Sequence, residues 1–266
     1  MTAVDFAAFV NDLATASGEA ILPFFRTAIG ADDKGANGRF DPVTEADKAG
    51  EAVMRQMIRR NFPLHGVVGE EFGSDRPDAE YCWVLDPIDG TRAFISGVPL
   101  WGTLIGLEHR GRPVYGMMHQ PFTREKFFGD GEGASWRGPD RHGKPHERRL
   151  STRRCADLKQ ATLMTTSPDL FLGDEAAAFR RCADAAKLTR YGGDCYAYCM
   201  LAAGLVDVVI ETGLQPYDIV ALIPIIEGAG GVVTNWEGGS AAKGGRVLAC
   251  GDRKLHEAVM GILATG

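Results

Sequence analysis

Two aspartates stand where an apolar run of the sequence ends. In the run WVLDPIDGT, Asp86 and Asp89 follow the hydrophobic residues, and Pro87 and Gly90 favour a tight turn there. Such a turn can direct both carboxylates and the Ile88 carbonyl into one pocket. Oxygen ligands of this kind suit a hard cation such as Mg²⁺, so the sequence predicts a divalent-metal site here.

An isolated pair of aspartates at this spacing more often caps a turn than binds metal, so the interpretation needs further support. Other segments supply it. The run VVGEE ends in carboxylates at Glu70, DPVTEAD places Asp47 in the first turn of an expected helix, and PYD places Asp218 at the start of another. Acids that converged without cations would repel one another and raise their pKa values, so the set itself predicts bound metal.

The turn after Asp89 also offers a place for a phosphate group. Amides at the start of a helix lack intrahelical acceptors, so those of Gly90 and Thr91 are available to an anion. Two metal ions about 3.5–4 Å apart can activate water on one side of phosphorus and neutralise the leaving oxygen on the other. The residues therefore predict hydrolysis of a phosphate ester.

The elements that position these acids can be read from the hydrophobic pattern. Three- and four-residue steps predict a helix from Phe6 to about Pro23, and Thr44 with Asp47 resembles a capping box at the start of a second. From Tyr81 the pattern changes to strands, with an antiparallel hairpin expected around residues 110–111 and further short strands in 125–137. Strands and helices then alternate over 161–166, 174–187, 188–193, 194–204, 206–211, a helix from about 217, 231–235, 246–250 and 252–264.

This change of pattern divides the chain near residues 145–150. We expect residues 1–147 to form an α+β half with an antiparallel sheet and most of the metal ligands. Residues 148–266 should form an α/β half that contributes Asp218 and the substrate-specificity residues. Helices and sheets should be layered throughout, with the active site between the halves.

Composition limits the classes of protein that fit. The 266 residues are 45% hydrophobic and 24% charged, typical of a globular protein, and the net charge of −6 argues against nucleic acid as a partner. Charged and polar residues interrupt the apolar positions of the first twenty, so neither a signal peptide nor a membrane span is expected. The six cysteines form no Cys-x-x-Cys pair, which fits a reducing cytoplasm.

Two other stretches invite functional readings that we do not favour. The basic stretch within residues 137–154 has no interleaved aromatic residues for stacking, so we interpret it as a solvated loop and leave its role open. The segment GDGEGA, which begins at Gly129, resembles a dinucleotide-binding loop but lacks the following helix and acidic partner.

The order of these motifs resembles the inositol monophosphatase superfamily along nearly the whole chain. The matching motifs are DPVTEAD, GEE, DPIDGT and an aromatic residue before Asp218, which is Tyr217 here and Trp in most relatives. The superfamily includes phosphatases of inositol phosphates, fructose bisphosphate, adenosine 3′,5′-bisphosphate and histidinol phosphate. The resemblance implies a five-layered α-β-α-β-α sandwich, a small-molecule phosphate monoester as substrate, two to three Mg²⁺ ions per active site and a homodimer.

The resemblance also implies a role for each matching residue. The metal ligands would be Glu70, Asp86, the Ile88 carbonyl, Asp89 and Asp218, with Asp86 bridging two ions. Asp47 and Thr91 would form the catalytic pair that orients and deprotonates the attacking water. Thr91 alone is a poor base, because a hydroxyl needs a carboxylate to relay the proton.

Several details are more similar to the histidinol-phosphatase branch, including DPIDGTRAFISG, PLWGT and GDCYAY. Histidinol phosphate carries an ammonium group, so anionic contacts suit it, and Asp194 and Glu211 align with positions that contact the non-phosphate part of the substrate. Helix capping by Asp194 and a solvated strand end at Glu211 are equally open. Arg92 could attract the phosphate or form a surface ion pair. We therefore predict hydrolysis of L-histidinol phosphate in histidine biosynthesis, with an inositol-1-monophosphatase or a related sugar or nucleotide phosphate phosphatase as the alternative.

Overall fold

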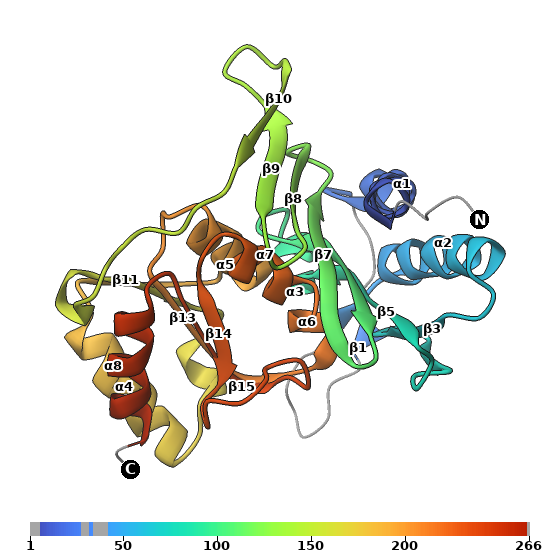
Figure 1. Ribbon diagram of the computed structural model, residues 1–266. Helices are drawn as coiled ribbons and strands as arrows, with labels where there is room; N and C mark the ends of the chain where they lie inside the picture. Colours follow the sequence, from blue (N-terminus) through green and yellow to red (C-terminus); the bar gives the residue numbers. More distant parts are fainter. Residues whose placement is uncertain (1–5, 28–31, 34–41, 265–266) are drawn as a thin grey trace.

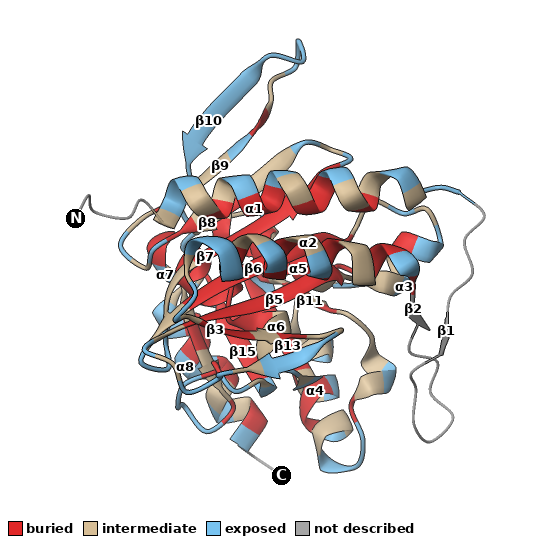
Figure 2. Cartoon of the chain, turned by 90° about the vertical axis from the view of Figure 1, so that its right-hand side faces the viewer, coloured by how far each residue is buried: buried red, intermediate tan, exposed pale blue. Residues whose placement is uncertain are grey.

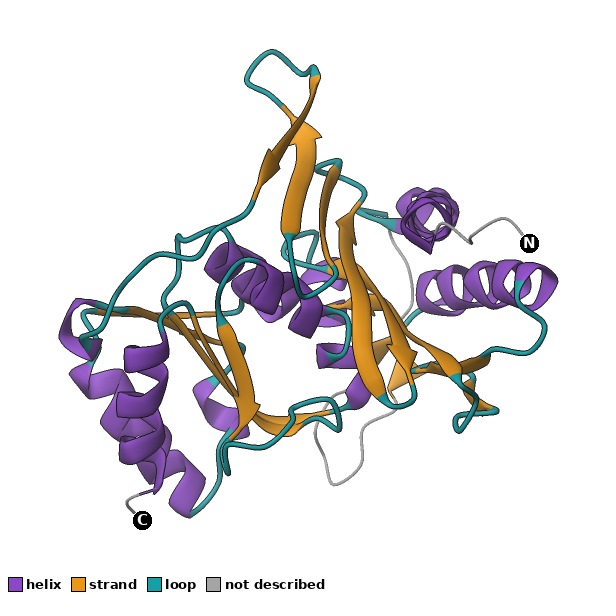
Figure 3. Ribbon diagram, viewed as in Figure 1, coloured by secondary structure: helices purple, strands orange, loops and turns teal. Residues whose placement is uncertain are grey.

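The computed structural model describes residues 6–27, 32–33 and 42–264, and in them helices and sheets alternate in layers (Figures 1 and 3). The helices are α1 (Phe6–Ile21), α2 (Glu45–Asn61), α3 (Thr91–Ile95), α4 (Asp174–Ala185), α5 (Asp194–Ala202), α6 (Pro216–Ile219), α7 (Leu222–Gly228) and α8 (Arg253–Ala264). The strands are β1 (Asp32–Asp33), β2 (Pro42–Val43), β3 (Gly66–Gly69), β4 (Gly73–Asp75), β5 (Tyr81–Asp89), β6 (Gly102–His109), β7 (Arg112–Gln120), β8 (Glu125–Gly129), β9 (Ala134–Pro139), β10 (Pro145–Arg149), β11 (Thr162–Thr165), β12 (Leu188–Tyr191), β13 (Val208–Leu214), β14 (Val232–Asn235) and β15 (Gly245–Cys250).

The larger sheet has the strand order β10-β9-β8-β7-β6-β5-β3-β4, and every pair is antiparallel except β3 with β5. Helices α1 and α2 cover one face, with their buried sides turned toward the sheet (Figure 2). Trp83 and Leu85 of β5 enter this outer core together with Leu13 of α1 and Met54 of α2. Strand β5 is buried along nearly its whole length, because helices cover both of its faces.

The middle layer consists of α5 and α7, which pack between the two sheets. Their apolar residues join a core cluster with Leu104 and Met118 of the larger sheet and with Val209 and Val247 of the smaller sheet. This cluster includes residues of both sheets, so it fixes how the two sheets lie relative to each other.

The smaller sheet has the order β12-β11-β13-β15-β14, in which β11 is parallel to β12 and β13 and the other pairs are antiparallel. Helices α4 and α8 cover its outer face, where Phe179 and Val259 pack on Ile210 and Leu248. The five layers of helices, sheet, helices, sheet and helices confirm the predicted sandwich.

The predicted elements are present, with two differences. The helix expected from about residue 217 is broken into α6 and α7, because Pro224 lacks an N–H and its ring opposes the carbonyl of Val220. The basic stretch is partly a strand and not wholly a loop. Strand β10 pairs with β9 at the sheet edge and is exposed at every residue, so it carries no alternating apolar pattern (Figure 2).

Three further expectations concern the DPVTEAD motif, the division of the chain into halves and a membrane-spanning helix. Asp41, which opens the DPVTEAD motif, lies outside the described residues. The larger sheet ends with Arg149 and the smaller sheet begins at Thr162, while the division at residues 147 and 148 stays a prediction. In the part of the chain that the structure describes, no helix is both long and apolar enough to cross a bilayer.

Candidate active site

An acidic cavity of about 160 Å³ lies between the two sheets. It is formed by the end of β5 and the turns after β3 and β11, together with the first turns of α3, α5 and α6. Nine of the eleven predicted site residues line the cavity, together with Thr166, which was not predicted. The lining consists of Glu70, Asp86, Ile88, Asp89, Gly90, Thr91, Arg92, Thr166, Asp194 and Asp218. The predicted residues that are not part of this lining are Asp47 and Glu211.

The end of β5 directs two carboxylates toward one side. Side chains alternate along a regular strand, so Asp86 and Asp89, three residues apart, would face opposite sides of the sheet. The register with β6 shifts between these two residues, and this irregularity turns both toward the cavity. The Ile88 amide donates to Asp86 Oδ1 at 3.0 Å, which fixes the turn from within.

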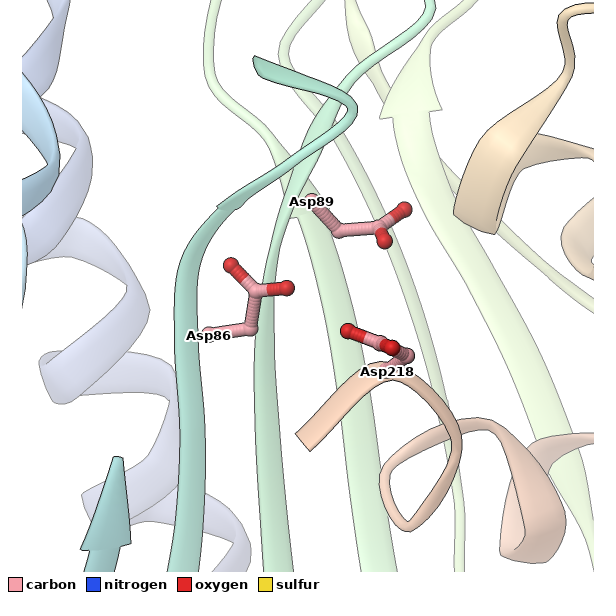
Figure 4. A group of neighbouring side chains, drawn as sticks. All are labelled: Asp86, Asp89 and Asp218. Carbon is pink, nitrogen blue, oxygen red and sulfur yellow. The ribbon is translucent and has the colours of Figure 1, made fainter. Parts of the chain in front are cut away.

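Asp218 approaches the same point from α6 (Figure 4). It is the third residue of that helix, and its Oδ2 accepts the Gln215 amide at 2.7 Å in a capping box. One oxygen from each of Asp86, Asp89 and Asp218 lies within 4.8 Å of the others. Three carboxylates this close form a donor set that fits a divalent cation.

The electrostatics of the triad formed by Asp86, Asp89 and Asp218 agree with this fit. Burial raises the pKa of Asp86 well above its ordinary value, and the charges of Glu70, Asp89, Asp218 and Asp47 raise it further. Burial likewise raises the pKa of Asp89, followed by the charges of Asp194 and Asp218, although the Cys195 amide donates to Asp89 Oδ2 at 2.6 Å. Ionised acids here need a positive partner, and a bound cation would supply it.

A buried ion pair holds the turn that carries Glu70. Glu51 of α2 is fully buried, accepts from Arg55 Nε at 2.6 Å and from the Glu71 amide at 2.7 Å, and also binds the Phe72 amide. Arg55 donates in turn to the Gly73 carbonyl. The backbone after β3 is therefore held by α2, which fixes the position of the Glu70 backbone.

Gly90 caps α3 with a left-handed backbone, φ +87°. A Cβ there would lie 2.9 Å from the Leu100 carbonyl oxygen, so both conformation and space require glycine. Thr91 follows, and its hydroxyl donates to the Ile88 carbonyl at 3.0 Å.

Asp47 lies buried in the first turn of α2. Its Oδ2 accepts the Thr44 hydroxyl at 2.5 Å and the Thr44 amide at 2.7 Å, which confirms the predicted capping box. These bonds, and the bond between Thr91 and Ile88, do not join Asp47 to Thr91, so their catalytic pairing stays a prediction. The charge of Asp47 nevertheless reaches the cavity, since it helps to raise the pKa of Asp86.

On the side of the smaller sheet, Asp194 and Thr166 line the cavity. Burial raises the pKa of Asp194 to about 6, while a hydrogen bond with Thr166 and the charge of Arg92 act in the opposite direction. Asp194 begins α5 in a left-handed conformation, φ 44°, and Gly193 rather than Asp194 occupies the cap position. Its predicted alternative role as the helix cap is therefore not the one it has.

Glu211 lies behind this wall. It is 1% exposed, and it accepts the Thr166 amide at 2.6 Å and the Thr165 hydroxyl at 3.1 Å. The alternative of a solvated strand end is therefore wrong. Burial raises the pKa of Glu211 to about 8.

Two contributions to the site were missed in the sequence. Thr166 follows β11, and because β11 runs parallel to β13 it lies beside Glu211 in the middle of β13. The parallel pairing was the signal that could have found it. The Cys195 amide that binds Asp89 carries no such signal, since a backbone donor has no residue type to recognise.

The layered fold and the acidic cavity between its sheets define the class of protein, a layered α/β protein with a candidate metal centre. The inositol monophosphatase family model matches residues 3–265, so the chain belongs to this family. The bifunctional phosphatase IMPL2 of Arabidopsis thaliana is 44% identical over 264 residues, 95% of this chain and 73% of that protein. A histidinol-phosphatase of Mycobacterium tuberculosis is 35% identical over 237 residues, 85% of each chain.

Among solved structures, an inositol monophosphatase from Zymomonas mobilis superposes with a TM-score of 0.86 at 39% identity, covering 97% of each chain. The family and these relatives identify the chain as a phosphatase. The relatives differ in the substrates that their names state, so the particular ester has to be argued from the cavity.

Proposed function

We propose that the protein is a Mg²⁺-dependent phosphatase that hydrolyses L-histidinol phosphate to L-histidinol and phosphate. The observation that carries the choice of substrate is Asp194, a carboxylate in the cavity wall that is not one of the triad. An ammonium group beside it would gain a charge-assisted hydrogen bond, which a neutral polyol cannot match. The histidinol-phosphatase of Mycobacterium tuberculosis, 35% identical, also supports this choice.

Asp86, Asp89 and Asp218, with Glu70 and the Ile88 carbonyl at the same cavity, are the groups that would hold the ions. Bound Mg²⁺ would lower the pKa of water and offset the negative charge that develops on the ester oxygens. The amides of the first turn of α3 would receive the phosphate group, with Arg92 at its edge.

The chemical step would proceed by attack of a water oxygen on phosphorus. The bond from phosphorus to the ester oxygen breaks, and the leaving alkoxide takes a proton from solvent water to become the alcohol. Thr91 would orient the attacking water and pass its proton toward Asp47, whose buried carboxylate is held by Thr44.

Phosphate release measured from histidinol phosphate and from inositol 1-phosphate, at equal saturating Mg²⁺, tests the assignment. We expect kcat/KM to be larger for histidinol phosphate. If inositol 1-phosphate is turned over equally well or faster, the histidinol assignment fails.

The variant Asp194→Asn sharpens this test, because asparagine tolerates the left-handed backbone and keeps the size of the side chain. We expect KM for histidinol phosphate to rise about tenfold or more, the weight of a charged hydrogen bond of about 1.5–3 kcal/mol. KM for inositol 1-phosphate should change much less. An equal change for both esters would contradict the role given to Asp194.

A further inference from the structure

A tyrosine hydroxyl is buried beneath the cavity wall. Tyr198 of α5 is 3% exposed, and among the described residues its hydroxyl has no hydrogen-bond partner. A buried hydroxyl without a partner costs about 1–3 kcal/mol, and phenylalanine would fill the same space without this cost. The hydroxyl therefore calls for an explanation other than packing.

Its surroundings are rich in acceptors. Tyr198 follows Asp194 by four residues, so the two side chains share one face of α5, and this helix packs against β11 and β13. Burial raises the pKa of the Tyr198 phenol, and the nearby charges of Glu211, Asp89 and Asp218 raise it further, with Glu211 the largest of the three. A neutral donor is thus enclosed between α5 and the sheet whose strand β13 carries Glu211.

Glu211 connects this donor to the cavity. Its two oxygens accept the Thr165 hydroxyl and the Thr166 amide, and a carboxyl group keeps further acceptor capacity whether or not it is protonated, so it can take another donor. Thr166 lines the cavity and hydrogen-bonds with Asp194. The same buried carboxylate therefore holds the segment that faces the substrate.

We propose that Tyr198 is a positioning residue whose buried hydroxyl donates to Glu211 when the cavity is occupied, and so holds the Thr165–Thr166 wall against the non-phosphate part of the substrate. Tyr198 does not touch the substrate itself. The inference rests on the phosphatase activity proposed above but not on which ester is preferred, so KM is measured with whichever ester of the panel is turned over fastest.

The first test compares Tyr198→Phe with Ser17→Ala. Ser17 of α1 is also fully buried, and its hydroxyl likewise has no partner within the described chain, but it lies in the outer core away from the cavity. Both variants should melt at or above the wild-type temperature without metal. Tyr198→Phe alone should raise KM about tenfold, equivalent to about 1.4 kcal/mol, while kcat changes less than threefold.

A readout without metal or turnover comes from hydrogen exchange of the segment 162–167. Exchange of the Thr166 amide in the presence of inorganic phosphate and the product alcohol should be faster in Tyr198→Phe than in wild type. In Ser17→Ala it should be unchanged. Unchanged KM together with unchanged exchange in Tyr198→Phe would overturn the proposal and leave the hydroxyl without a role in positioning.

Glu211→Gln provides the second variant, should Tyr198→Phe fold poorly. It keeps one carbonyl acceptor and should show the same rise in KM. If Tyr198 acts through Glu211, the double variant should be no worse than the poorer single variant. Additive losses in KM would refute an action through Glu211. A failure of the proposed substrate would show separately, as a different preferred ester with the same variant pattern.

Discussion

Removing one charge from the triad should stabilise the metal-free protein. In Asp86→Asn the remaining carbonyl oxygen can still accept the Ile88 amide, so the turn after β5 keeps its internal bond. The triad oxygens lie within 4.8 Å of one another, and at that limit two carboxylates in an effective dielectric constant of about 20 repel by about 3.5 kcal/mol. Partial protonation relieves some of this repulsion, since the pKa of Asp86 is raised.

The net gain from losing the Asp86 charge should therefore be about 1–3 kcal/mol. For a chain of this size each kcal/mol corresponds to about 2–4 °C, so the metal-free variant should melt about 2–12 °C higher than wild type. Magnesium at 100 times its Kd should stabilise wild type by about 2.7 kcal/mol, and this shift should largely vanish in the variant. Turnover should fall at least about 100-fold.

The assay is thermal unfolding followed by circular dichroism, with EDTA or with a magnesium series. Asp130→Asn is the matched control, because the Asp130 side chain also accepts an amide two residues along the chain but is exposed in a turn. It should leave both melting temperatures unchanged. If metal-free Asp86→Asn melted no higher than wild type and kept the full magnesium shift, the reasoning about the triad would be refuted.

Three further predictions concern residues that are buried or conformationally constrained. His119 is 7% exposed and its pKa is lowered to about 3, so between pH 6.5 and 3 the unfolded state binds a proton that the folded state does not. The free energy of unfolding therefore decreases as the pH is lowered through this range, by up to about 1.4 kcal/mol per pH unit. The melting temperature of His119→Gln should therefore fall less steeply than that of wild type as the pH is lowered. Parallel plots of melting temperature against pH would contradict the lowered pKa of His119. Glu51→Ala should cost about 3–5 kcal/mol in urea unfolding, because Arg55 stays buried without its partner, whereas Glu51→Leu with Arg55→Met should recover part of the loss; an additive double variant would exclude the clamp. Gly90→Ala should lower both stability and kcat, while Gly131→Ala, with a similar φ of +86° but open space around a Cβ, should show only the backbone strain; equal effects would rule out the contact with the Leu100 carbonyl.

The acids of the cavity could be predicted because each follows a local pattern. Asp86 and Glu70 end apolar runs, Asp47 lies in a capping box and Asp218 begins a helix, so residue type and position in the element agree. The hairpin between β6 and β7 and the alternation of the second half were likewise visible as changes of period.

What could not be predicted depends on contacts between distant segments. Glu211 lies behind Thr166 and outside the cavity lining, and only the parallel pairing of β11 with β13 determines this. The left-handed backbone of Asp194 could not be read from its residue type, because aspartate adopts this conformation more often than most residues but still in only a small fraction of cases. Strand β10 was missed because an exposed edge strand needs no apolar face.

The bond from the Cys195 amide to Asp89 has a mechanical consequence. Asp89 belongs to the larger sheet, whereas this amide and Asp218 come from helices that follow the smaller sheet's strands in the chain. A cation bound by the triad would thus link the larger sheet to a helix that follows a strand of the smaller sheet. A substitution that weakens the packing between the two sheets, even one in the middle helices far from the cavity, should therefore weaken cation affinity. Cation binding should in turn stabilise the packing between the sheets.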